Sequence, residues 1–300
     1  MSPRQADPIE LDGVAHRWVQ ANGVRMHVAE AGMDKPGPTL VLIHGWPQHW
    51  WCWNAVIPLL AEHHHVVALD LRGHGWSDAP DPQEGTYDKR TLADDVVALI
   101  EALDLDRPVL VGHDWGAWVS LVVGSRHSRA VRGVVATAIV APWATVPAKD
   151  LWRFGYQLVV GGPWGVPMHQ RVNQWVLRTV FRVASADRRP WPAGRVEPYL
   201  ERYRHRERAA AGRAMYGTFL TRELPAMQRG EYAAQPEDLP LLFLPGRRDG
   251  VLTPDLVRRG VRGPNASMTV IDGAGHWVPE EQPEALAREV LGFVAGLGDR

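Results

Sequence analysis

The stretch VLVGHDWGA, residues 109–117, decides the fold. Its valine-rich start predicts a short buried strand, and a helix-length apolar segment begins after Gly116. Asp114 lies between them, with Gly112 and Gly116 two residues away on either side. This arrangement has the form of the sharp strand–turn–helix G-x-S-x-G, with an acid in place of the serine. Residues near the tip of such a turn must be small, and glycine meets that need. We expect Asp114 at the tip, with N–H groups at the start of the following helix directed at it.

An aspartate at this tip favours attack on alkyl carbon. A serine needs a base to deprotonate it and suits acyl carbon, and on saturated carbon it would form an ether that water does not easily cleave. An aspartate, with a pKa of about 3.9, is already a nucleophile at neutral pH. The ester that it forms with an alkyl carbon is open to hydrolysis. The residue type therefore predicts substrates such as epoxides or haloalkanes. The alternative is that Asp114 is only a helix N-cap, a position at which Asp is favoured.

Buried apolar strands alternate with helices on both sides of this stretch. An Asn22-Gly23 turn joins the segments His16–Gln20 and Met26–Glu30 into a hairpin. This alternation is typical of an α/β fold with a mostly parallel sheet covered by helices on both faces. Further strands are predicted at 39–43, 66–69, 131–138, 241–244 and 267–271, and helices at 91–103, 117–127 and 284–297, the first of them capped by Thr91.

The alternation stops over residues 142–234, which carry tryptophans and Pro-Gly breaks and no strand pattern. We expect a helical cap over 142–234, inserted after the sixth strand into a core made of residues 1–141 and 235–300. The charged run Glu201–Arg213 within it is interpreted as a solvated helix face.

Three groups follow predicted buried strands in the order nucleophile, acid, histidine: Asp114, Asp249 and His276. In an open α/β sheet the carboxyl ends of the parallel strands share one edge, where sites form. A lone histidine in a glycine-rich loop is usually structural, but three such groups in this order favour a catalytic triad. We expect Asp249 to orient His276 as a base that activates water.

The segment His44-Gly45-Trp46-Pro47 follows the third strand, where a loop can supply a second oxyanion N–H. This segment, the Gly112–Gly116 turn and Gly275-His276 together resemble the epoxide hydrolases of the α/β-hydrolase superfamily. The resemblance covers nearly the whole chain. It implies an eight-stranded core with a helical cap, and hydrolysis of an epoxide to a vicinal diol through an ester on Asp114. It also implies an oxyanion hole formed by the backbone N–H groups of Trp46 and Trp115.

The same resemblance implies two cap tyrosines that donate protons to the epoxide oxygen. Tyr156, in a Tyr-Gln-Leu context, and Tyr216 are the matching positions, although Gly217 departs from a common Tyr-Arg pattern. Tyr199 and Tyr203 are the rivals. The tryptophan-rich cap favours an apolar or aromatic substituent on the epoxide. The predicted substrate-binding residues are His44, Pro47, Trp115, Trp152 and Trp277.

Two other functions remain open. A haloalkane dehalogenase uses the same Asp-His-Asp chemistry with N–H donors for the halide, and Trp115 with a cap tryptophan such as Trp152 or Trp164 suits that role. Against it, Trp46 stands where those enzymes more often have Asn or Glu. A binding protein that has lost catalysis would be expected to break the triad, which this chain keeps.

Composition narrows the class of protein. With 300 residues and a net charge of -1, the chain offers no electrostatic case for binding nucleic acid or a membrane. Cys52 is the only cysteine, which excludes an internal disulfide, and the N-terminal residues lack a signal-peptide pattern. We expect a cytoplasmic monomer or homodimer that acts on a small epoxide and water, with no cofactor and no metal.

Overall fold

The computed structural model describes residues 7–170, 174–187, 191–192 and 194–298. Eight strands form one sheet in the order β1-β2-β4-β3-β5-β6-β7-β8, and the first two pairings, β1 with β2 and β2 with β4, are antiparallel while the others are parallel. The strands are β1 (Ala15–Ala21), β2 (Val24–Ala31), β3 (Leu40–Ile43), β4 (Val66–Leu69), β5 (Val109–His113), β6 (Gly133–Thr137), β7 (Leu241–Leu244) and β8 (Ala266–Met268).

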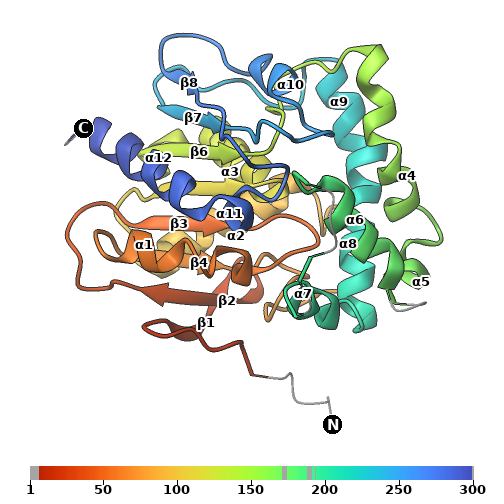
Figure 1. Ribbon diagram of the computed structural model, residues 1–300, viewed down its shortest axis with the longest axis horizontal. Coiled ribbons are helices and arrows are strands. Elements are labelled where there is room, and N and C mark those ends of the chain that lie inside the picture. Colours follow the sequence, from red (N-terminus) through yellow and green to blue (C-terminus); the bar gives the residue numbers. More distant parts are fainter. Residues whose placement is uncertain (1–6, 171–173, 188–190, 193, 299–300) are drawn as a thin grey trace.

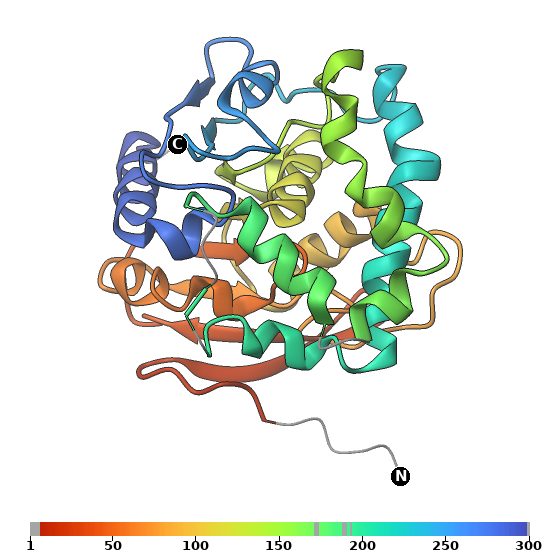
Figure 2. The ribbon, with the colours of Figure 1, turned by 45° about the vertical axis from the view of Figure 1, so that its right-hand side comes forward.

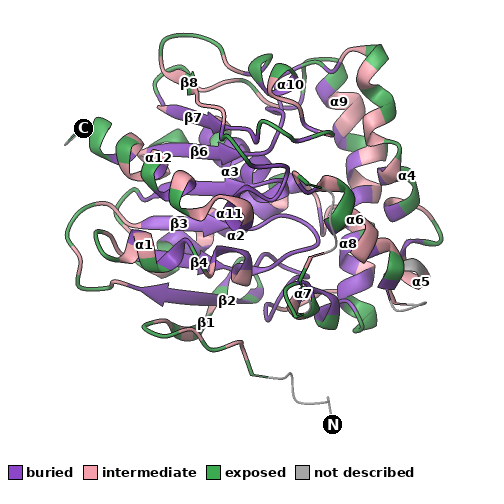
Figure 3. Ribbon diagram, viewed as in Figure 1, coloured by how far each residue is buried: buried purple, intermediate pink, exposed green. Residues whose placement is uncertain are grey.

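The predicted α/β fold is confirmed, and its core lies where the strand patterns placed it. Every residue of β3, β4, β5, β6 and β7 is buried, as expected of parallel strands covered on both faces (Figure 3). The hairpin turn has a positive φ at both Asn22 and Gly23, the geometry that favours this residue pair.

Helices cover both faces of the sheet (Figure 1). On one face lie α1 (Ile57–Ala61) and α12 (Pro283–Gly296), and on the other α2 (Lys89–Ala102) and α3 (Trp115–Arg126). Helix α2 begins two residues before the predicted start: Thr91 lies inside the helix, and its hydroxyl donates to the carbonyl of Gly85 instead of capping. Four further short helices occur in this described part of the chain: η1 (Trp50–Trp53), η2 (Ser128–Ala130), α10 (Pro254–Arg258) and α11 (Val278–Glu281), the last of them directly before α12.

The helices between β6 and β7 lie across the edge of the sheet where the parallel strands end (Figures 1 and 2). Only helices and loops occur among the described residues between Thr137 and Leu241. They are η3 (Ala148–Phe154), α4 (Tyr156–Gly161), α5 (Gly165–Gln170), α6 (Trp175–Ala184), α7 (Glu197–Arg202), α8 (Arg206–Thr218), the π-helical turn η5 (Phe219–Glu223) and α9 (Leu224–Gln228). We refer to residues 142–234 as the cap, a boundary that stays a prediction.

The charged run of the cap is not simply a solvated face. Arg208 is 1% exposed and donates to the carbonyls of His74 and Ser77, and buried Arg202 donates to the carbonyl of Gly75. The prediction was wrong for these two residues because the loop after β4 offers buried carbonyls that need donors. Within the described part of the chain, no helix is both long enough and apolar enough to span a membrane.

Candidate active site

Asp114 stands at a strained turn between β5 and α3. Its φ of 49° and ψ of -122° are uncommon for a residue with a side chain. The turn needs glycine on both sides: a Cβ at Gly112 would lie 2.4 Å from Cα of Ala117, and one at Gly116 would lie 2.1 Å from the carbonyl oxygen of Ile43. The side chain of Asp114 makes no capping hydrogen bond to α3, so the N-cap interpretation does not describe it.

Two backbone N–H groups meet the carboxylate of Asp114. The N–H of Trp46 donates to Oδ2 over 3.0 Å, and the backbone N–H of Trp115 helps to lower the pKa of the carboxyl. Trp46 is brought there by the loop after β3, in which the Trp46–Pro47 peptide is cis. These are the two N–H groups predicted for an oxyanion hole. Because Oδ2 accepts the N–H of Trp46, Oδ1 is the oxygen that is freer to react.

His276 lies between the two carboxylates. Its Nδ1 is 2.9 Å from Oδ2 of Asp249, and its Nε2 is 3.8 Å from Oδ1 of Asp114. The other oxygen of Asp249 accepts from the N–H groups of Val251 and Leu252, which fixes the carboxylate. The structure thus brings together three residues that are far apart in the sequence, each in a loop after a strand.

Burial and charge act on these groups in opposite directions. Burial raises the pKa of Asp114 to about 6, against the lowering effects of His276 and of the two N–H donors. Burial disfavours the charged form of His276, but attraction by Asp249 and Asp114 outweighs it and raises the pKa of the imidazole. The nucleophile is therefore poorly solvated, while the base is held by a fixed anion.

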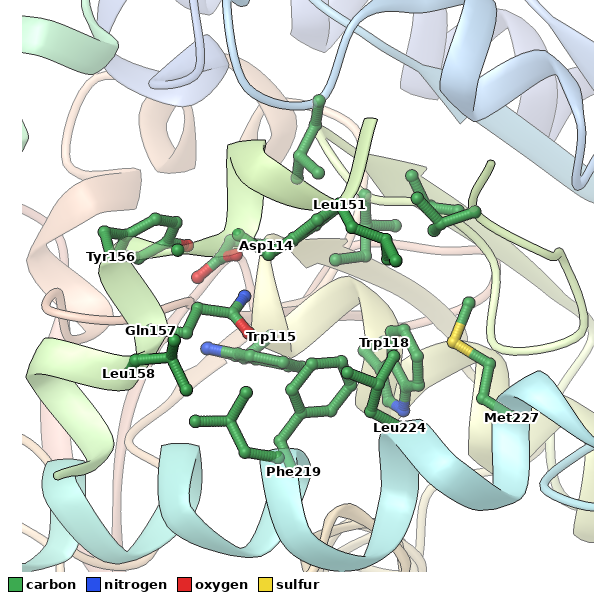
Figure 4. A pocket seen from close by; sticks show the side chains of 17 residues that line it. Asp114, Trp115, Trp118, Leu151, Tyr156, Gln157, Leu158, Phe219, Leu224 and Met227 are labelled. Atoms are coloured by element: carbon green, nitrogen blue, oxygen red, sulfur yellow. The ribbon is translucent and has the colours of Figure 1, made fainter. Parts of the chain in front are cut away.

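The four tyrosines considered as proton donors lie in different places. Figure 4 shows the hydroxyl of Tyr156 directed toward the carboxylate of Asp114. Tyr216 is buried edge-on against the rings of Tyr156, Trp46 and Trp115. Burial is the main cause that raises the pKa of both tyrosines, and the charge of Asp114 adds to it.

The two alternative tyrosines, Tyr199 and Tyr203, make other contacts. Tyr199 donates its hydroxyl to Oε1 of Glu280 over 2.8 Å and is therefore engaged away from Asp114. Tyr203 packs edge-on against Trp46 and His74. Neither lines the pocket described next.

A pocket of about 240 Å³ opens beside the nucleophile (Figure 4). Asp114 and Tyr156 lie at one end, and Trp118 and Met227 lie at the other. Apart from Asp114, Tyr156 and Gln157, its lining is hydrophobic. The remaining lining residues are Trp115, Trp118, Ile139, Val140, Val146, Leu151, Phe154, Gly155, Leu158, Phe219, Leu220, Leu224, Met227 and Leu252.

Several predicted substrate-binding residues lie outside this pocket. Trp152 is 71% exposed with the guanidinium of Arg153 over its ring, while its neighbour Leu151 lines the pocket instead. Trp277 is buried and donates its indole N–H to the carbonyl of Phe181. Of the five predicted residues, Trp115 alone lines this pocket, and a role of the other four in substrate binding stays a prediction.

The remaining two shape the loop that carries Trp46. His44 has no exposed surface, and its ring nitrogens contact the N–H of Leu71 and the carbonyl of Gly45. Pro47 is buried in the cis turn. Both residues shape the backbone of the loop after β3, and neither lines the pocket.

Sequence reasoning missed the hydrophobic half of the pocket. Trp118 lies one helical turn after Trp115 on α3, a spacing that puts both on one face. Phe219 and Met227 come from η5 and α9, whose apolar residues carry no signal for which face meets a ligand. Among the described residues, no group of three or more His, Cys, Asp or Glu side chains is arranged to hold a metal ion.

Comparison with known proteins agrees with this geometry. Residues 40–289 match the model of the alpha/beta hydrolase family. The chain belongs to this family. Epoxide hydrolase A of Mycobacterium tuberculosis is 32% identical over 94% of this chain and 97% of its own length. The AB hydrolase superfamily protein YfhM of Bacillus subtilis is 28% identical over 95% of this chain and 99% of its own. The ligand-free structure of the epoxide hydrolase CorEH superposes with a TM-score of 0.80 at 26% identity, covering 95% of this chain and 99% of that one. The resemblance to epoxide hydrolases is confirmed.

Proposed function

We propose that the protein hydrolyses an epoxide to a vicinal diol through a covalent ester on Asp114. The observation that carries the proposal is an acid nucleophile that faces a phenol hydroxyl on one side and a histidine on the other, at the end of an apolar pocket. Relatives over nearly the whole chain that are named epoxide hydrolases support it.

In the first step, Oδ1 of Asp114 attacks an epoxide carbon. A new C–O bond forms while a C–O bond of the ring breaks, and the leaving oxygen becomes an alkoxide. Tyr156 donates its phenol proton to that oxygen, with the ring of Tyr216 packed edge-on against it. Oδ1 is the attacking atom because Oδ2 accepts the N–H of Trp46.

In the second step, water attacks Cγ of the ester, and His276 takes the proton. The oxyanion that forms on Oδ2 is held by the N–H of Trp46, which already donates to Oδ2 of the free carboxylate, and by the N–H of Trp115. When the bond from Cγ to the alkyl oxygen breaks, His276 returns its proton to the leaving diol, and the oxygen from water stays in Asp114. Asp114 is left as the carboxylic acid and loses its remaining proton to solvent, and solvent returns a proton to Tyr156.

The apolar lining favours an epoxide with a hydrophobic substituent that reaches from Asp114 toward Trp118 and Met227. A haloalkane substrate is the second candidate. A halide leaves without a proton, so the hydroxyl of Tyr156 directed at Asp114 favours the epoxide.

The experiment is the intact mass of the His276→Gln variant after incubation with small panels of apolar epoxides and haloalkanes. Loss of the base stalls the second step, so we expect a mass gain equal to the whole epoxide, mapped by peptide analysis to Asp114. A gain of an alkyl group with release of halide would assign a dehalogenase. The matched control, Asp114→Ala in the same background, is expected to gain no mass from either panel. An adduct on another residue, or an inert wild-type protein, would contradict the proposal.

A further inference from the structure

A buried ammonium group lies behind the pocket, and no step of the proposed reaction uses it. Lys89 is the first residue of α2 and has no exposed surface. Its Nζ lies 4.4 Å from the ring centroid of Trp115 and 5.2 Å from that of Phe219. Both rings line the pocket, and Trp115 also supplies a backbone N–H to the nucleophile. The cation therefore contacts a residue that both lines the pocket and acts on the nucleophile through its backbone N–H.

The ammonium is fixed by two oxygen partners from the cap. Nζ lies 2.8 Å from Oε2 of Glu223 and donates to the carbonyl of Met215. The carboxylate of Glu223 is itself held, since Oε1 accepts the N–H of Lys89 over 2.7 Å and the hydroxyl of Tyr232 over 2.9 Å. Glu223 ends the π-helical turn η5, a geometry often found at functional sites.

The cost of this arrangement argues for a role. Taking an ammonium out of water is expensive, and a buried ion pair is often no more stable than apolar residues of the same volume. Burial lowers the pKa of Lys89, while the charges of Glu223, Asp88 and Asp114 oppose that shift.

We infer that Lys89 is a positioning residue for the nucleophile turn. Its ammonium holds the indole of Trp115 between itself and the pocket, and the bonds of the ammonium to Glu223 and Met215 tie the turn to the cap. A cation over an indole face attracts it with a preferred geometry. Fixing the ring fixes the start of α3, and with it the N–H that meets Asp114. The inference rests on the proposed opening of an epoxide at Asp114.

Two single variants separate positioning from a simple ion pair. Lys89→Met removes the cation from the ring and leaves Glu223 unpaired. Glu223→Gln removes the carboxylate but keeps the ammonium on Trp115 and the carbonyl of Met215. A merely structural pair would make the two variants alike in catalysis. The double variant Lys89→Met/Glu223→Gln removes both charges, so it lacks the cation without leaving a buried carboxylate unpaired.

We expect the single-turnover rate of ester formation to fall on the order of tenfold in Lys89→Met and in the double variant, because small displacements of reacting groups slow chemistry steeply. Glu223→Gln should stay within about threefold of wild type, although it lowers the thermal midpoint. Rates are measured well below each midpoint, with circular dichroism confirming the fold. Wild-type rates in the double variant, or an equal loss in Glu223→Gln, would overturn the inference.

Hydrogen exchange of residues 113–118 tests the same idea without turnover. We expect faster exchange in this segment in the double variant than in Glu223→Gln. If the two variants exchange alike there, the inference fails. A wild-type protein inert toward every epoxide would contradict the proposed function alone, and the exchange experiment would still decide the role of Lys89.

Discussion

The backbone N–H of Trp46 reaches Oδ2 of Asp114 over 3.0 Å, although the two residues are 68 positions apart in the chain. The contact depends on Gly45, whose backbone packs directly against the nucleophile. A Cβ at Gly45 would lie 2.4 Å from Cβ of Asp114 and 2.6 Å from Oδ2. The loop after β3 can therefore supply an N–H to this carboxylate only while residue 45 has no side chain.

Gly45→Ala should slow hydrolysis of the ester by about 10²–10³-fold, the usual loss when an oxyanion donor is removed. The methyl group pushes either Asp114 or the loop away, so the N–H of Trp46 no longer meets Oδ2. Single-turnover ester formation and its hydrolysis measure the two steps separately.

The matched control is Gly292→Ala on α12. A Cβ at Gly292 meets nothing within 4 Å, and the residue lies in an exposed helix interior. Activity should be unchanged, and the free energy of unfolding should rise by about 0.5–1 kcal/mol because alanine favours the helix. Normal catalysis in Gly45→Ala would show that the contact is not needed.

The rate of ester formation should depend on pH through Asp114. The carboxylate is the nucleophile, and its pKa is raised to about 6, so protonation removes it as the pH falls below that value. We expect the single-turnover rate to fall about tenfold for each pH unit below the midpoint. The charge of His276 lowers the pKa of Asp114, so His276→Gln should move the midpoint to higher pH. A rate that stays flat down to pH 5 would contradict this prediction.

Replacing each tyrosine by phenylalanine should separate their roles. Tyr156→Phe removes the hydroxyl directed at Asp114 and should slow ester formation by about 10²–10⁴-fold, the usual contribution of a general acid. Tyr216 packs against the ring of Tyr156 and does not line the pocket, so a smaller loss is expected from Tyr216→Phe.

Tyr199→Phe is the control for these variants, because the hydroxyl of Tyr199 donates a hydrogen bond to Glu280. We expect near-normal ester formation with a lower thermal midpoint. All three rates come from the same rapid-quench assay with one epoxide. If Tyr199→Phe were the slowest of the three, the assignment of Tyr156 would be wrong.

The strand ends, unlike the cap, were predictable from the sequence. Buried strands have continuous apolar patterns, and Asp114 and Asp249 each follow one. His276 follows the edge strand β8, which is only partly buried and shorter than the predicted strand 267–271. The meeting of the three residues at one sheet edge follows from parallel topology. The glycines at 112 and 116 marked the turn because no other residue type fits there.

Cap residues carry no comparable signal. Trp152 is exposed while Leu151 lines the pocket, and the one-residue difference depends on how η3 packs on the core. Similarly, Arg208 looks like a surface residue, but it is buried because the loop after β4 presents carbonyls to it. Composition of a short helix does not determine which face meets the core, so tertiary packing settled both positions.

Glu280 should make the stability of the protein depend on pH. Its carboxyl is buried between cap and core, where it accepts from the hydroxyl of Tyr199 and from the amide of Gln48. Burial raises its pKa from 4.5 to about 8, against the lowering effects of these two bonds and of Arg195. Between these two values the folded state binds more protons than the unfolded state, so stability falls as the pH rises through that window.

Glu280→Gln keeps the shape of the side chain and cannot ionise. The variant should therefore gain stability relative to wild type as the pH rises from 5 to 9, by roughly 2–4 kcal/mol in the free energy of unfolding. Chemical denaturation at pH 5, 7 and 9 measures the difference. Glu284→Gln, at an exposed position in the first turn of α12, should instead follow the wild-type dependence on pH. A constant difference between Glu280→Gln and wild type across this range would mean that Glu280 stays ionised in the folded protein, and that its contacts with Tyr199 and Gln48 compensate fully for its burial.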